Sequence, residues 1–173
     1  MITGAECSHP VTVAGSAADT VVGVSNQPTV IELQLRWGDM DPLEHTNTVM
    51  IARLIEEARV RALDIWFGSG RRAGIGLLVA RQEIEFVASL LYSVEPARCE
   101  VWCSRIGGKS AEFGCRLLAA DGTVAALAET TLAVVDRDTG RPTPIDDELR
   151  ELLAAHSGDP VPFRARRQAS SPA

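Results

Sequence analysis

Polar residues crowd into one short segment of an otherwise apolar chain. Residues 36–48 read RWGDMDPLEHTNT and directly precede an amphipathic run. Pro42 fixes its own φ and biases Asp41 toward an extended conformation, so we expect Asp41 in a turn with its side chain free to face a cleft. Asn47 or Thr46 is a natural N-cap, which places the unpaired amides of a helix start near that carboxylate. Such amides can polarise a carbonyl group while the carboxylate attacks it or activates water.

The same segment has a purely structural interpretation. Acidic residues before a helix often serve only as caps and turn formers, and Asp39 can simply brace Arg36. A single histidine such as His45 is more often a hydrogen-bonded surface residue than a catalyst. The chain contains no G-x-S-x-G elbow, no H-E-x-x-H motif and no phosphate-binding loop. Spacing alone therefore leaves catalysis and simple turn formation both open.

The composition limits the classes of protein. With 173 residues, 46% of them apolar and 23% charged, the chain predicts one globular domain. A net charge of −6 argues against nucleic-acid or membrane-surface partners. No apolar run approaches the roughly 20 residues of a membrane-spanning helix, and residues 1–28 lack the Lys and Arg of a targeting signal. We expect a soluble cytoplasmic protein that binds small molecules or other proteins.

Hydrophobic periodicity places the elements around the polar segment. Alternation over 29–37 predicts a strand whose buried face carries Ile31, Leu33, Leu35 and Trp37. Helical spacing over 49–67 predicts a long helix. Its expected apolar side comprises Met50, Ile51, Leu54, Ile55, Ala58, Ala62, Ile65 and Trp66, and its polar side Arg53, Glu56, Glu57, Arg59 and Arg61.

Four strand-like runs follow, at 77–89, 97–106, 109–120 and 123–135. Gly-Gly and Asp-Gly turn signals separate the last three, which predicts an antiparallel meander. A short helix is expected within 145–156. These elements predict an α+β fold.

Element lengths indicate how the helix and the sheet pack. A 19-residue helix is about 28 Å long and strands of eight to ten residues span about 26–33 Å, so the helix can lie along a sheet that curls around it. Such a sheet has open edges, and pairing them with a second copy predicts a dimer. We divide the chain into a flexible extension (1–28), the domain (29–156) and a flexible tail (157–173).

The four cysteines form no C-x-x-C pair. Cys99 and Cys103 lie on one side of a predicted strand, and Cys7 and Cys115 stand alone in sequence. Buried reduced thiols are the favoured interpretation over metal ligands or a redox pair.

The polar segment also carries a family resemblance. RWGDMDPLEHTNT, continued by VMIARLIEEAR, resembles the signature of hotdog-fold acyl-CoA thioesterases of the 4-hydroxybenzoyl-CoA thioesterase type, in which RWGDMDPLGHVNN leads into a helix ending EEAR. The likeness continues through VARQEIEF, IGGKSAEF and VVDRDTGRPTPI. It implies a single hotdog domain, an antiparallel five-stranded sheet curled around one long central helix. It also implies a homodimer or tetramer with the acyl-CoA site between subunits, and hydrolysis without a metal or redox cofactor.

The resemblance implies roles for particular residues. Asp41 matches the catalytic carboxylate, as nucleophile or general base, and Thr48 matches the position whose backbone N–H polarises the thioester carbonyl. His45 and Asn47 match the polar residues that shape the turn. The expected acyl pocket is formed by Met50, Ile51, Leu54 and Phe86.

The chain departs from the family pattern at several positions. Glu44 replaces a glycine, Thr48 replaces the second asparagine, Ile51 and Leu54 replace helix tyrosines, and Ser89 stands near a usual proline. If the glycine is needed for a positive φ, Glu44 strains the turn by about 1–2 kcal/mol. Equally, Glu44 can add a second carboxylate to the site.

Two alternatives to an acyl-CoA thioesterase follow from these departures and from the surface charges. One is a non-catalytic hotdog module that binds acyl-CoA or acyl carrier protein. The other is thioester release from an acidic carrier protein, with Arg71, Arg72, Arg105 and Lys109 as candidate contacts.

Overall fold

A computed structural model describes residues 27–68 and 74–164 of the protein. Its elements are β1 (Thr29–Leu33), a 3-10 helix η1 (Trp37–Asp39), α1 (Thr48–Phe67), β2 (Ile75–Phe86), β3 (Ala97–Ile106), β4 (Ser110–Leu118), β5 (Val124–Asp136) and α2 (Asp147–Ala154). Cys7 and all but the last two residues of the expected extension over 1–28 lie outside the described residues. None of the helices in the described part of the chain is long and apolar enough to cross a membrane.

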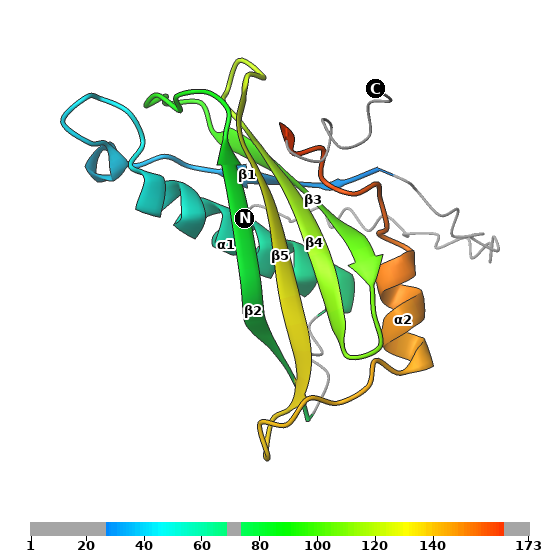
Figure 1. Ribbon diagram of the computed structural model, residues 1–173. Coiled ribbons are helices and arrows are strands. Elements are labelled where there is room, and N and C mark those ends of the chain that lie inside the picture. The colour runs from blue at the N-terminus through cyan, green and yellow to red at the C-terminus, as the bar shows by residue number, and fades with distance from the viewer. Residues whose placement is uncertain (1–26, 69–73, 165–173) are drawn as a thin grey trace, which may run out of the picture.

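The five strands form one antiparallel sheet in the order β1-β3-β4-β5-β2 (Figure 1). The predicted meander is confirmed for β3, β4 and β5. Strand β2 crosses over to pair with β5, so its other side is an edge of the sheet among the described strands. Its middle, Leu78–Gln82, is exposed on both faces, and the pairing skips Ala80 as a bulge between Val79 and Arg81.

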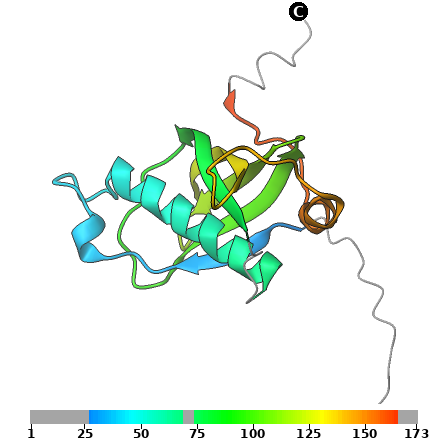
Figure 2. The same ribbon diagram turned by 90° about the horizontal axis from the view of Figure 1, so that it is seen from below.

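Helix α1 lies across the inner face of the curved sheet (Figure 2), as the lengths of the elements predicted. Alternate residues of the central strands point toward it, and Val101, Phe113 and Cys115 are almost completely buried. Leu54 and Ile55 of α1 pack in the same core. Burial of this apolar helix face stabilises the domain. A five-stranded antiparallel sheet curved around one long helix in this way is a hotdog fold.

The predicted faces of α1 are wrong at two positions. Arg59, expected on the polar side, is only 3% exposed, while Ile65, expected in the core, is 63% exposed. The guanidinium of Arg59 donates from Nη1 to Thr130 Oγ1 on β5 at 3.0 Å, so a hydroxyl acceptor compensates part of its desolvation. Burial lowers the pKa of Arg59 from its ordinary value. Leu63 takes the buried place that was expected for Ile65.

The first strand is shorter than predicted. It ends at Leu33, and Trp37 opens η1 with 71% of its surface exposed instead of lying on the buried face. The turn arises because the Arg36 N–H donates to Asp39 Oδ2 at 3.0 Å, which competes with strand pairing. Trp37 instead meets Tyr92 edge to face, with ring centroids 5.5 Å apart.

The expected flexible tail over 157–173 is wrong for its first half. Val161 and Phe163 are 1% and 2% exposed and form a small cluster with Leu127 on the sheet. The Trp102 indole N–H of β3 donates to the Asp159 carbonyl at 2.7 Å.

The close approach of this C-terminal segment requires glycine. A Cβ at Gly158 would come 2.7 Å from the Trp102 ring, and one at Gly114 would come 2.4 Å from it. Residues 157–164 thus form a strap that packs on the sheet. The polar composition of this segment did not predict that packing. Residues 165–173 lie outside the described part of the chain.

Candidate active site at the start of helix α1

The turn before α1 is built around the side chain of Asp41. Its Oδ1 accepts from the backbone N–H groups of Leu43 at 2.8 Å and His45 at 3.1 Å. The Asp41 N–H donates to the His45 carbonyl at 2.7 Å, so the turn closes on itself. These bonds fix the carboxylate through one oxygen and leave Oδ2 outside the turn's own hydrogen bonds.

Glu44 occupies the tip of this turn with a φ of +62°. It is the one non-glycine residue with a positive φ among residues 27–68 and 74–164. Its N–H donates to the Asp41 carbonyl at 3.0 Å, which closes a turn over residues 41–44. The positive φ expected of the replaced glycine is therefore present, and the glutamate bears the strain.

The start of α1 presents backbone donors beside the turn. Of the two candidate caps, Asn47 is the N-cap: its side chain accepts from the Val49 N–H at 2.9 Å, and its carbonyl accepts from the Ile51 N–H at 3.0 Å. Within the described residues, no hydrogen bond satisfies the Thr48 N–H, which is the first helical amide. Thr46 is buried and donates its N–H to the Leu90 carbonyl at 2.8 Å.

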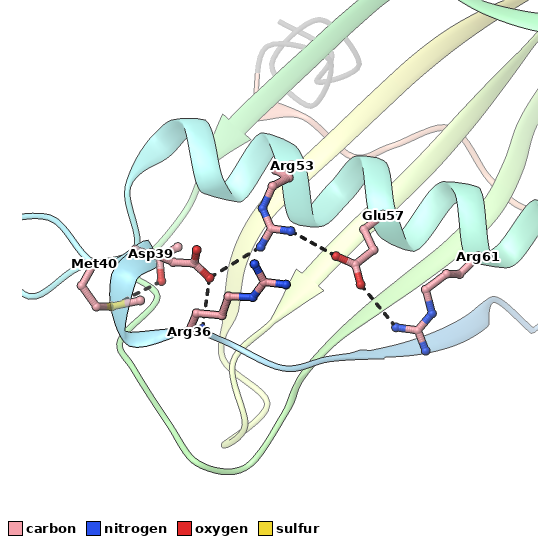
Figure 3. A network of polar contacts seen from close by, with 7 residues as sticks. Arg36, Asp39, Met40, Arg53, Glu57 and Arg61 are labelled. Carbon is pink, nitrogen blue, oxygen red and sulfur yellow. Dashed lines mark hydrogen bonds and ion pairs between the residues drawn. The ribbon is translucent and has the colours of Figure 1, made fainter.

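Asp39 is a structural brace, as its first interpretation proposed. It is 4% exposed, and its Oδ2 lies 3.6 Å from Arg53 Nη2 in addition to accepting from Arg36. Figure 3 shows the carboxylate between these two arginines, with Glu57 and Arg61 continuing the chain of ion pairs along α1. The two aspartates, which spacing alone does not separate, thus differ in environment.

A groove of about 360 Å³ opens where the turn, the start of α1 and the end of β2 meet. Its polar wall comes from the turn and the first helical turn, and its apolar wall from α1 and the segment after β2. The lining residues are Asp41, His45, Thr46, Thr48, Ile51, Phe86, Val87, Ala88, Ser89 and Leu90.

The structure brings five of the eight predicted site residues to this groove: Asp41, His45, Thr48, Ile51 and Phe86. Asn47 caps the helix and does not line the groove. Neither Met50 nor Leu54 lines it: Met50 is half-buried, and Leu54 is 1% exposed in the core.

Sequence reasoning missed Thr46 and the segment 87–90. Residues 87–89 were predicted as the end of a strand over 77–89, but β2 ends at Phe86, and the segment is irregular. It is held by the Val87 N–H, which donates to the Ala125 carbonyl at 2.8 Å, and by the bond between Thr46 and Leu90.

The thiols of residues 27–68 and 74–164 do not compete as nucleophiles. Cys99, Cys103 and Cys115 are free and buried, as predicted for reduced core cysteines, and none lines the groove. Burial raises the pKa of Cys103 to about 11, and a hydrogen bond to Cys115 together with burial raises that of Cys99. Both are therefore thiols rather than thiolates at neutral pH.

The groove combines a fixed carboxylate with an unpaired helix amide. This pair can hold a carbonyl oxygen on the Thr48 N–H while the carboxylate attacks the carbonyl carbon or takes a proton from water. In the described part of the chain, no three His, Cys, Asp or Glu side chains gather in a way that could hold a metal ion.

Comparison with known proteins extends this picture. Residues 35–153 match the thioesterase-like superfamily, a stretch that contains the turn, α1, the sheet from β2 onward and almost all of α2. No curated protein matches the chain.

Several solved structures share the fold. A thioesterase from Thermus thermophilus, solved with coenzyme A and zinc, is 24% identical over 76% of this chain and 95% of its own, with a TM-score of 0.65. A thioesterase superfamily protein from Jannaschia sp. CCS1 is 22% identical over 84% of this chain and 99% of its own, at 0.69. A DHNA-CoA thioesterase from Staphylococcus aureus is 17% identical over 82% and 91%, at 0.63.

Proposed function

The chain belongs to the thioesterase-like superfamily, and we propose that it is an acyl-CoA thioesterase that hydrolyses its substrate in the groove at the start of α1. The observation that carries the proposal is the shared groove of the Asp41 carboxylate and the unpaired Thr48 amide. Asp41 acts as general base or nucleophile, and the Thr48 N–H stabilises the oxyanion.

In the general-base route, Asp41 takes a proton from water as the water oxygen bonds to the thioester carbon. The carbonyl oxygen becomes an oxyanion that accepts from the Thr48 N–H. Collapse of this intermediate breaks the carbon–sulfur bond, and the thiolate of coenzyme A leaves and takes up a proton. In the nucleophile route, an Asp41 oxygen displaces the thiolate first, and water then hydrolyses the anhydride. Both routes give a carboxylic acid and free coenzyme A.

Neighbouring residues have supporting roles in this proposal. Asn47 holds the helix start, and His45 fixes the Asp41 carboxylate through its backbone N–H. Ile51 and Phe86 form the apolar wall against which the acyl group packs. Met50, which is half-buried and next to Ile51 in sequence, stays a predicted contact, whereas Leu54 is buried in the core and does not line the groove.

Coenzyme A is the proposed leaving group because a structure of this fold, the Thermus thermophilus thioesterase, was solved with that molecule. The alternative of a carrier-protein substrate depends on free cations. Of its candidate contacts, Arg105 is paired with Glu112 at 2.8 Å, and Arg71 and Arg72 lie outside the described residues.

The alternative of a non-catalytic binding module was motivated by Glu44 and by Thr48 in place of the second asparagine. The turn accommodates this glutamate at a positive φ with both hydrogen bonds to Asp41 Oδ1 in place. This geometry supports catalysis over mere binding. The cytoplasmic location stays a prediction, and the buried free thiols agree with a reducing compartment.

The edge strand supports assembly as a dimer. Leu78 and Val79 are 56% and 53% exposed in the middle of β2. The backbone groups on the open edge of this strand can form hydrogen bonds with another strand. We propose that two copies pair antiparallel along β2, and a tetramer built from such dimers stays a prediction. An Ala80→Cys variant should cross-link to a dimer under a mild thiol oxidant, whereas Val30→Cys, on the distant strand β1, should stay monomeric on a denaturing gel.

A panel of acyl-CoA thioesters tests the reaction itself. Purified protein is mixed with acetyl-, straight-chain, branched and benzoyl-CoA, and the released thiol is detected by its colour reaction. Turnover of at least one substrate is the expected result. Acyl-CoA binding by calorimetry without any release of thiol would instead favour the binding module, and hydrolysis confined to carrier-bound acyl groups would favour the carrier-protein substrate.

A further inference from the structure

The strap lies beyond the part of the chain that matches the thioesterase-like superfamily. That match ends at residue 153, whereas the strap occupies residues 157–164. At its start, the Gly158 N–H donates to the Cys103 carbonyl at 3.0 Å, just past the stretch of β3 that pairs with β1. The steps proposed above do not use the strap, and the shared fold does not explain it.

The strap crosses the face of the sheet that points away from α1 (Figure 2). It runs from β3 toward β2, the last strand in the order of the sheet. On the way Val161 and Phe163 pack against Leu127 of β5, and at the end Arg164 contacts Glu85 of β2. One end of the strap is thus bound to β3 and the other to the edge strand.

The contact with β2 lies directly behind the groove. Glu85 is opposite Leu127 in the pairing of β2 with β5, and Phe86 is opposite Ala126. Successive residues of a strand point to opposite faces, so Glu85 and Leu127 face the strap while Phe86 and Ala126 face α1. The burial agrees, because Ala126 belongs to the core under α1 and Leu127 to the cluster with the strap. The strap therefore backs the strand end whose other face forms the apolar wall of the groove.

Arg164 holds both carboxylate oxygens of Glu85. Its backbone N–H donates to Oε2 at 2.8 Å, and its Nε lies 3.2 Å from Oε1. Oε1 is shielded from solvent and accepts no well-aligned hydrogen bond within the described residues, so the guanidinium is the charge that compensates it. Because an uncompensated buried charge is costly, this ion pair fixes the end of β2 against the strap.

The wall on the groove side is only partly packed. Phe86 and Val87 are 47% and 38% exposed, and β2 has no strand on its other side among the described residues. Beyond Phe86 the backbone is held by the N–H groups of Val87 and Ala88, which both donate to the Ala125 carbonyl, at 2.8 and 3.2 Å. The position of the wall therefore depends on the contacts behind it.

Resting on the proposed acyl-CoA thioesterase, we infer that the strap positions the apolar wall of the groove, with Arg164 and Glu85 as positioning residues for binding of the acyl group. Asp41 and Thr48 lie on the polar wall, where the hydrogen bonds of Asp41 and the N-cap stay within the turn and the helix start. Loosening the strap should weaken acyl binding in the ground state and the transition state alike. Such a loss raises KM and leaves kcat unchanged.

Breaking the ion pair gives the test. Glu85→Gln and Arg164→Gln each remove one charge, and Glu83→Gln is the matched control, since Glu83 lies on the same face of β2 and pairs with Arg81 of the same strand. For the longest acyl-CoA that the wild type hydrolyses, KM is expected to rise about tenfold in either variant, because loss of one methylene contact costs about tenfold. The kcat of both variants and the KM of Glu83→Gln should match the wild type.

A double-mutant cycle checks that the two residues act together. The Glu85→Gln/Arg164→Gln variant should have a KM no higher than the single variants, because each change removes the same contact. Glu85→Gln keeps a side-chain oxygen for the Arg164 N–H, so it should stay folded. Tm is recorded in parallel, which separates a loss of stability from the change in KM.

An unchanged KM in both single variants, with or without a fall in Tm, would overturn the inference, because the strap would then only stabilise the fold. An equal rise in Glu83→Gln would also overturn it, since the effect would then follow from the charge of the strand face. Both failures are distinguishable from failure of the proposed function, because the wild type would still hydrolyse acyl-CoA. A wild type inactive on every thioester would overturn both.

Discussion

Replacing Glu44 with glycine should stabilise the protein. Glu44 is exposed and holds a φ of +62°, a conformation that costs an L-residue about 1–2 kcal/mol. Glycine removes that cost but adds about 0.5–1 kcal/mol of chain entropy to the unfolded state. The free energy of unfolding should therefore rise by about 0.5–1 kcal/mol. For a chain of this size, each kcal/mol raises Tm by about 2–4 °C.

Urea denaturation at 25 °C, followed by tryptophan fluorescence, measures this change. The matched control is Glu44→Ala, which removes the same carboxylate but keeps the Cβ and hence the strain, so its unfolding midpoint should stay within error of the wild type. A Glu44→Gly variant less stable than the wild type would show that the left-handed backbone is not strained. An equal gain from Glu44→Ala would assign the effect to the carboxylate charge instead.

Two further variants test other parts of the structure. His156 stacks on Trp66 with ring centroids 4.4 Å apart, and burial lowers its pKa below the ordinary 6.5. Since the unfolded chain then binds the proton more readily, the free energy of unfolding should fall as the pH drops below about 6.5, and His156→Phe should flatten that slope in urea titrations at several pH values. A wild type that gains stability on acidification would contradict this. Phe163→Ala should lower the free energy of unfolding by about 3 kcal/mol, whereas no loss would mean that the strap is not packed.

Much of the fold was predictable because its signals are local. The 3.6-residue period of α1 and the two-residue period of the central strands follow directly from which side chains face the core. The turn before α1 was also readable, since Pro42 and the capping residue Asn47 act within a few residues.

The errors arise where a distant partner decides the outcome. Arg59 is buried because Thr130, 71 positions away in sequence, offers a hydroxyl acceptor, and no local pattern contains that fact. The strap is ordered because Trp102 and two glycines form a slot for it. Strand β2 pairs with β5 instead of its neighbour in sequence, so its open edge could not be assigned before the topology was known.

The candidate site divides in the same way. The polar wall lies within one short segment, and its residues other than Thr46 were predicted, whereas the apolar wall at 87–90 comes from irregular chain after β2. Spacing alone did not separate Asp39 from Asp41; the family resemblance singled out Asp41, and the structure shows Asp39 buried against Arg53.

Thiol release by Asp41→Asn tests the central claim most directly. Asparagine keeps an oxygen for the N–H groups of Leu43 and His45, so the turn should persist while the base or nucleophile is lost. We predict a fall in kcat of about 10²–10⁴-fold on the best acyl-CoA of the panel, with the dimer and its Tm retained. Glu44→Gln, which removes a carboxylate from the same turn but outside the groove, should retain kcat. Full activity in Asp41→Asn would contradict the assignment of this groove as the site of hydrolysis.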